Sequence, residues 1–133
     1  MAQELGSGRS RGQLATRGLA ALLGGAGVMH FVAPKVFDPI VPRVLPGPAR
    51  AWTYVSGVAE VGCAGLVAVP RTRRVGGRLA ALLFVAVLPA NVKMAWDWRT
   101  QSMSRRAVAY ARVPLQVPLV WWALRVARRG RGR

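Results

Sequence analysis

Residues 51 to 69 read AWTYVSGVAEVGCAGLVAV, and this stretch decides the fold. As a helix it would be about 28 Å long, close to the roughly 30 Å of hydrocarbon in a bilayer. Glu60 is the only charged side chain within it, and Pro70 follows directly. The stretch therefore predicts a membrane-spanning helix with one carboxylate near its middle.

Three further windows of similar length are almost free of charge. We expect these windows to span the membrane at residues 16–33, 75–96 and 108–127. Together with residues 51–69 they predict an all-α fold, a membrane four-helix bundle with a proline-rich loop between its first two helices. Pro89 lies near the end of the third window, where it should kink the helix and free the carbonyl near Val85. In lipid, a neighbouring helix must then satisfy that carbonyl.

Composition excludes several other classes of protein. Of the 133 residues, 53% are hydrophobic, and 20 basic residues face only 4 acidic ones, for a net charge of +16. A disordered basic chain would lack the apolar residues, and a nucleic-acid binder should carry its basic residues on a folded soluble face. Here the arginines bracket apolar windows. We therefore expect a disordered basic tail at 1–15, a transmembrane domain at 16–127 and a basic tail at 128–133.

The distribution of Lys and Arg predicts an orientation. Twelve of them fall on the side of the two termini and eight on the opposite side. Positive charge is retained on the cytoplasmic side of a membrane, so we expect both termini to be cytoplasmic.

Each predicted span carries at least one polar side chain in its middle or outer half, and the span at 75–96 carries two. At about 1.5 Å per residue these side chains come to related depths, which predicts a shared polar pocket. Its candidate members are His30, Glu60, Asn91, Lys93 and Gln116. The sequence holds no nucleophilic triad, phosphate loop or metal motif, so we expect no catalytic residue, no metal site and no evident cofactor.

Two interpretations of Glu60 stay open. It either binds a substrate or proton, or it ties helices together by a hydrogen bond or an ion pair. A neutral carboxyl would donate to Gln116 or Asn91, whereas an ionised one needs a cation such as Lys93 or protonated His30. Cys63, the single cysteine, is expected to be a packing residue.

Between Gly18 and Ala123 the chain resembles the DoxX-like family of small bacterial membrane proteins. The resemblance rests on several separated motifs that occur in the order of that family. They are His30-Phe31 with Pro34, Phe37, Ile40-Val41-Pro42 and Leu45-Pro46; Ser56-Gly57 with Glu60; Pro70 before an arginine; Pro89-Ala90-Asn91 with Met94; and Arg112 with Pro114-Leu115-Gln116.

The resemblance implies a multi-pass protein of the bacterial plasma (inner) membrane. DoxX-like proteins accompany a thiosulfate:quinone oxidoreductase or a complex with a sulfurtransferase and superoxide dismutase. A quinone is thus implied by resemblance alone, together with an oxidoreductase subunit as partner. Since the chain has no redox cysteine pair, we expect an accessory subunit that is not catalytic by itself. The alternative is a small transporter or lipid-handling protein acting as a homo-oligomer. Membrane lipids are expected partners in either case, and nucleic acid is not.

Overall fold

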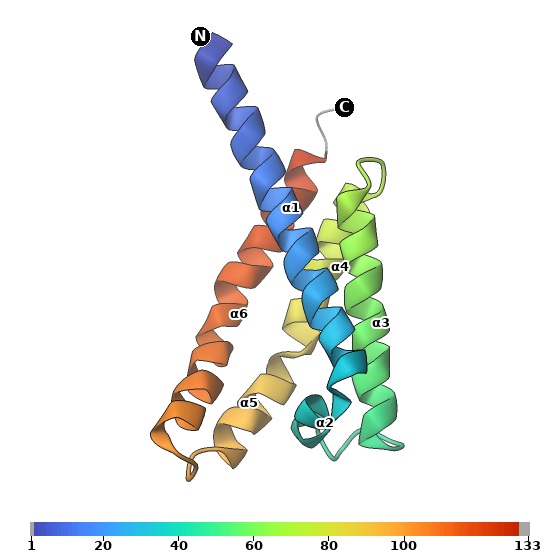
Figure 1. Cartoon of the computed structure of the whole chain (residues 1–133), viewed down its shortest axis with the longest axis vertical. Helices are drawn as coiled ribbons and strands as arrows, with labels where there is room; N and C mark the ends of the chain where they lie inside the picture. The colour runs from blue at the N-terminus through green and yellow to red at the C-terminus, as the bar shows by residue number, and fades with distance from the viewer. Residues whose placement is uncertain (1, 131–133) are drawn as a thin grey trace.

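The computed structural model describes residues 2–130, which form helices joined by turns and loops, with no strand among these residues. The elements are α1 (Ala2–Val32), α2 (Pro34–Phe37), the 3-10 helix η1 (Asp38–Ile40), α3 (Ala49–Ala68), α4 (Arg73–Ala86), α5 (Leu88–Asp97) and α6 (Met103–Arg129). Figure 1 shows the start of α1, the α3–α4 turn and the end of α6 at one end of the molecule. We call this the termini end, and the opposite end, with α2 and the α5–α6 turn, the loop end.

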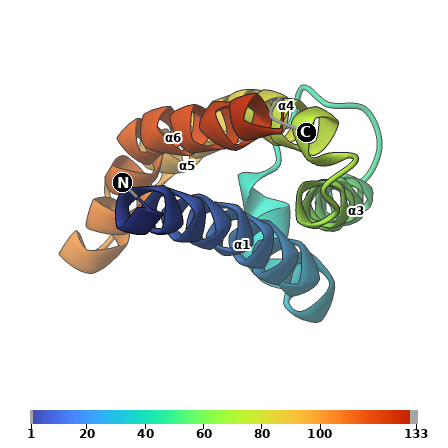
Figure 2. The ribbon, with the colours of Figure 1, turned by 90° about the horizontal axis from the view of Figure 1, so that it is seen from above.

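The long helices pack around a small apolar centre. Seen from the termini end, α4, α5 and α6 lie along one side, α1 lies opposite them and α3 closes the edge (Figure 2). α1 packs mainly against α3, and α4 packs mainly against α6. The largest cluster of buried apolar side chains draws on α1, α3, α4 and α6, with Leu19, Val67, Ala80 and Val126 at its centre.

Three helical stretches are long and apolar enough to cross a membrane: Gln3–Val32, Ala49–Ala68 and Arg73–Asp97. Much of their apolar surface faces outward, as Val58 at 63% and Leu82 at 64% exposure illustrate. An exterior of this kind would be unfavourable in water and suits contact with lipid chains. The three stretches agree with the spans expected at 16–33, 51–69 and 75–96.

The fourth expected span, residues 108–127, lies inside α6 but is not among these apolar stretches. α6 is long enough to cross a bilayer and continues through Pro114 and Pro118. Arg112 and Gln116 make it more polar than the other long helices. The chain thus has three apolar candidate spans, with α6 as a more polar fourth long helix.

Residues 2–15, expected as a disordered tail, are instead helical in the structure, because α1 begins at Ala2. Serine often favours a turn, but two serines here form hydrogen bonds to the helix backbone. Ser7 Oγ donates to the Glu4 carbonyl and Ser10 Oγ donates to the Ser7 carbonyl, both at 2.9 Å. Glu4 lies in the first turn, where a negative charge suits the helix dipole. Of the basic tail expected at 128–133, Arg128 and Arg129 end α6, while residues 131–133 lie outside the described residues.

Glycine lets α4 approach its neighbours at the termini end. A Cβ on Gly76 would lie 2.6 Å from the Val67 nitrogen of α3, and one on Gly77 would lie 2.8 Å from the Ala123 oxygen of α6. Both contacts are with backbone, so no larger residue fits without moving a helix. Arg73 fastens the same end, because its Nε donates to the Val67 carbonyl at 2.9 Å.

The helix break expected at Pro89 is present, because α4 ends at Ala86 and α5 begins at Leu88. Proline supplies no N–H and so interrupts the backbone ladder. The Phe84 carbonyl accepts a hydrogen bond from Gln116 Nε2 of α6 at 2.7 Å. A neighbouring helix thus satisfies a carbonyl at the break, one residue from the expected Val85.

Candidate functional site

His30 of α1 and Glu60 of α3 meet between the two helices. Gly27 and Gly57 lie one turn before them, on the same helix faces, and allow the approach. A Cβ on Gly27 would lie 3.0 Å from the Gly57 oxygen, and one on Gly57 would lie 2.9 Å from the His30 Cβ. His30 Nδ1 lies 3.1 Å from Glu60 Oε2, and both side chains are largely buried, at 11% and 14% exposure. Glu60 therefore faces α1 rather than lipid.

The hydrogen bonds of His30 define its tautomer. Nδ1 lies 2.7 Å from the Ala26 carbonyl oxygen, which can only accept, so Nδ1 carries the hydrogen. That hydrogen is directed at Ala26 and leaves Glu60 Oε2 buried without a hydrogen-bond partner among the described residues. An unpartnered buried oxygen is costly and is usually explained by a function, a water or an ion.

Arg112 of α6 adds a third charge to this region. Its guanidinium is half-buried and close enough to both Glu60 and His30 to interact with them electrostatically. Arg112 Nη1 lies 3.7 Å from the Met94 sulfur of α5, which holds the side chain inward. We call His30, Glu60 and Arg112 the buried charge site.

Residues 34–40, which we call the cap segment, cover the site at the loop end. The Phe37 ring of α2 stacks on the His30 imidazole, with centroids 3.8 Å apart. Asp38 accepts hydrogen bonds from Arg50 Nε at 2.8 Å and Thr53 Oγ1 at 2.7 Å. The Arg50 guanidinium and the Thr53 hydroxyl lower the pKa of Asp38 below its ordinary value, because both stabilise the carboxylate. The cap segment is thereby fastened to α3.

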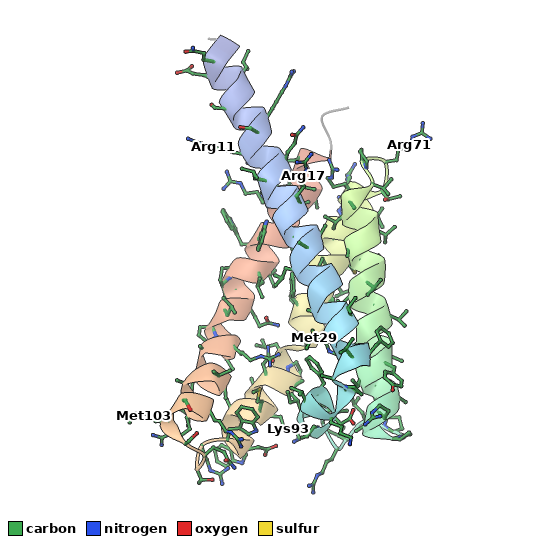
Figure 3. All side chains as sticks on the ribbon, viewed as in Figure 1. Arg11, Arg17, Met29, Arg71, Lys93 and Met103 are labelled. Atoms are coloured by element: carbon green, nitrogen blue, oxygen red, sulfur yellow. The ribbon has the colours of Figure 1, made fainter. Side chains whose placement is uncertain are left out.

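Lys93 lies outside the buried charge site. Its Nζ donates to the Pro39 carbonyl at 3.2 Å and pairs with Asp97, so that it fastens the cap segment to α5. A lysine near a helix end extends toward the polar interface, which explains the difference from the expected pocket. Figure 3 shows Lys93 at the loop end, while Arg11, Arg17 and Arg71 lie at the termini end.

Of the remaining pocket candidates, Gln116 is buried and donates to the helix break at Phe84. Asn91 is buried on α5, at 4% exposure. The structure thus brings together only His30 and Glu60 of the five candidates, and gives Gln116 and Lys93 bonds of their own.

Two contributors were missed as site residues. Arg112 was used as a topology charge and as part of the family resemblance but was not placed in the pocket, although it is the one charge in an otherwise uncharged run from 107 to 124. That isolation was the signal that could have identified it. Phe37 was named only in the family resemblance, because stacking on a histidine across a chain reversal leaves no sequence pattern that would place it in the site.

The site offers little for a bound metal. Among the described residues, no group of three or more His, Cys, Asp or Glu could hold an ion. Cys63 is buried, at 6% exposure, within the apolar cluster of α1, α3, α4 and α6. What the site offers instead is one acceptor oxygen without a donor, beside an imidazole and a guanidinium.

A family model described as "Domain of unknown function (DUF8561)" matches residues 19–127. The match begins within α1 and ends within α6, and it includes all three residues of the buried charge site. Comparison with curated proteins and with solved structures found no match.

Proposed function

The chain belongs to the DUF8561 family, and from that premise we propose that it is an accessory membrane subunit of a redox system. Its buried charge site would hold the polar head of a membrane-soluble ligand. The resemblance to DoxX-like proteins, carried by the motifs around His30, Glu60 and Arg112, supports a ligand that is quinone- or sulfur-linked.

The observation that carries this proposal is the buried Glu60 Oε2 without a hydrogen-bond partner. Leaving such an atom unpaired costs about 1–3 kcal/mol, and more for a charged group. A ligand hydroxyl that donates to this oxygen would remove the cost. In hydrocarbon, ionisable side chains are expensive to retain and commonly mark functional sites.

The donors and acceptors of the site fit a quinone. Glu60 Oε2 can accept from a hydroxyl of the reduced form, and Arg112 can donate to a carbonyl oxygen of the oxidised form. When bound, the quinone would supply two-electron, two-proton redox chemistry. The protein would orient the head group and hold a proton at Glu60 or His30. Electrons would come from a partner subunit, since the chain has one cysteine and one histidine.

We further propose that α6 crosses the membrane beside the three apolar spans, so that the protein is a four-helix bundle of the bacterial plasma membrane. The termini end would face the cytoplasm, since most of the Lys and Arg residues belong to it. A single cysteine at position 71, introduced as Arg71→Cys in a Cys63→Ser background, tests the orientation. A membrane-impermeant maleimide should label it in inside-out vesicles only. Labelling in intact cells would reverse the orientation.

The ligand proposal is tested by purifying the protein from its native membrane and measuring extracted quinone per chain, together with co-purifying oxidoreductases. Binding of ubiquinone-2 and menadione to the detergent-solubilised protein gives a second readout. Glu60→Gln should abolish quinone retention. Glu4→Gln, which removes an equal charge from an exposed position, should leave it unchanged. Equal retention by Glu60→Gln and wild type would overturn the proposal.

One observation favours the alternative of a small transporter. The α4–α5 break lies in the middle of a candidate span, and transporters bind substrates at such discontinuous helices. Four helices are few for a transport path, so this function would need a homo-oligomer. Quinone-free protein that moves a solute across liposomes, and loses flux in Glu60→Gln, would favour the transporter.

A further inference from the structure

A groove of about 470 Å³ runs between α1 and α6 at the termini end. Its lining is mostly apolar, but arginine side chains border it. The residues that matter to its chemistry are Arg11 of α1 and Trp121, Trp122, Arg125 and Arg129 of α6. A second groove of about 460 Å³ shares Trp121, Arg125 and Arg129 and extends along the outside of α6.

The arginines of this groove have few acidic residues near them in the chain. Residues 98–133 contain no Asp or Glu, and α1 contains only Glu4, in its first turn. The other acidic residues, Asp38, Glu60 and Asp97, have basic partners elsewhere in the fold. The rim of the groove therefore carries an excess of positive charge over an apolar floor.

The two tryptophans place the groove at the depth of lipid headgroups. Trp121 is 58% exposed, and the Arg125 guanidinium lies 4.9 Å from its ring centroid. Trp122 is held in place, because its Nε1 donates to the Ala15 carbonyl at 2.9 Å. Tryptophan rings favour the membrane interface, where one edge contacts headgroups and the rest contacts chains.

We infer that this groove binds an anionic phospholipid. Arg125 and Arg129 bind the headgroup phosphate, for which the planar guanidinium provides paired donors. An acyl chain lies on the apolar floor beside Trp121 and Trp122. Charge and apolarity occur together here, which matches a molecule with both an anionic head and a hydrocarbon tail. This site is separate from the buried charge site and does not depend on a ligand there; it rests only on the proposed placement of α6 across the membrane.

The experiment measures contact between lipid and Trp121 directly. The full-length protein is placed in nanodiscs containing either brominated phosphatidylglycerol or brominated phosphatidylcholine, whose bromines quench tryptophan fluorescence on contact. Subtracting the Trp121→Phe signal isolates the Trp121 contribution. Phosphatidylglycerol should quench Trp121 at a much lower mole fraction than phosphatidylcholine.

Arg125→Gln with Arg129→Gln should remove this preference. Each basic residue near an anionic surface contributes about fivefold to binding, so the double variant should lose about 30-fold. The matched control is Arg99→Gln with Arg105→Gln at the loop end, which removes the same charge. Arg99 also lies over a tryptophan, 4.1 Å from the Trp96 centroid. The control should keep the preference.

Two results would overturn the inference. An equal loss in the Arg99→Gln, Arg105→Gln control would mean that total charge, rather than this groove, attracts the lipid. Full displacement of phosphatidylglycerol by 10 mM inorganic phosphate would mean that the arginines bind phosphate without the acyl chain. Folding of each variant is checked by its circular dichroism spectrum.

Discussion

The two halves of the molecule are both packed through glycine, but they enclose different chemistry. At the termini end, Gly76 and Gly77 admit backbone of α3 and α6 and seal an apolar cluster. Toward the loop end, Gly27 and Gly57 bring α1 and α3 together around His30 and Glu60. The same device serves stability in one half and, in the other, brings His30 close to a Glu60 oxygen that has no hydrogen-bond partner among the described residues.

This difference separates the residues that stabilise the fold, at the termini end, from those that would bind a ligand, toward the loop end. Apolar packing in lipid comes from van der Waals contact and close helix approach, which the termini end supplies. A buried carboxylate contributes little to that packing and is costly in hydrocarbon. Substitutions at the termini end should therefore reduce stability, while those in the buried charge site should affect a ligand more than the fold.

The largest effect is expected at Gly77. In Gly77→Ala the new Cβ would lie 2.8 Å from the Ala123 oxygen and the Ala127 nitrogen, and backbone atoms cannot move aside cheaply. We expect a loss of about 2–3 kcal/mol in unfolding free energy, measured by thermal or chemical unfolding in detergent. Gly25→Ala is the control, because nothing lies within 4 Å of its Cβ. Equal stability of the two variants would refute the tight α4–α6 contact.

The next effect is expected at the helix break, between the two halves. Gln116→Leu removes the side-chain donor to the Phe84 carbonyl and replaces it with an apolar group. We expect a loss of about 1 kcal/mol, since hydrogen bonds between membrane helices have a modest net value. Gln101→Leu, at an exposed position in the α5–α6 turn, should change little. A Gln116→Leu variant as stable as wild type would show that another group satisfies the break.

Sequence reasoning located three apolar spans, because charge and proline mark span ends directly. The expected 51–69 span differs from α3 by two residues at its start and one at its end. Pro89 gave the helix break and the need for a neighbouring donor. The helical residues 2–15 were missed, because glycine, serine and arginine are typical of disorder and the hydroxyl-to-backbone bonds of Ser7 and Ser10 have no sequence signal.

The site was harder to predict than the helices. Rise per residue gives the depth of a side chain but not its direction around the helix axis. The expected depths placed five side chains in one pocket. In the structure only His30 and Glu60 of these five point toward each other and come into contact. Lys93 has a long side chain that reaches Pro39, and Arg112 was treated as a topology charge. Close contacts at Gly27 and Gly57 fix which faces of α1 and α3 meet, and these contacts become visible only after folding.

A smaller stability effect is expected at Glu60 itself. Glu60→Gln keeps a hydrogen-bonding side chain of the same size, and hydrogen bonds between membrane helices contribute only about 0.6 kcal/mol on average, so the unfolding free energy should change by less than about that amount. Glu60→Ala should also stay folded. Thermal unfolding in detergent measures both variants against wild type. A large destabilisation by Glu60→Gln would mean that Glu60 holds α1 and α3 together, and the contrast between the halves would fail.

The smallest effect is expected at the cap segment and depends on pH. The Arg50 guanidinium, with the Thr53 hydroxyl, lowers the pKa of Asp38 in the folded protein. A lowered pKa means that the carboxylate stabilises the fold above its ordinary pKa of about 3.9 and that this contribution is lost as pH falls through the folded pKa. The melting-temperature gap between wild type and Asp38→Asn should therefore be constant near neutral pH and shrink below about pH 3.9. In an Arg50→Gln background the gap near neutral pH should be smaller, because the Arg50 guanidinium, the first cause of the lowered pKa, is gone. A gap that widens on acidification would show that Asp38 is not held as a carboxylate, and the cap segment would then be fastened to α3 by something other than this ion pair.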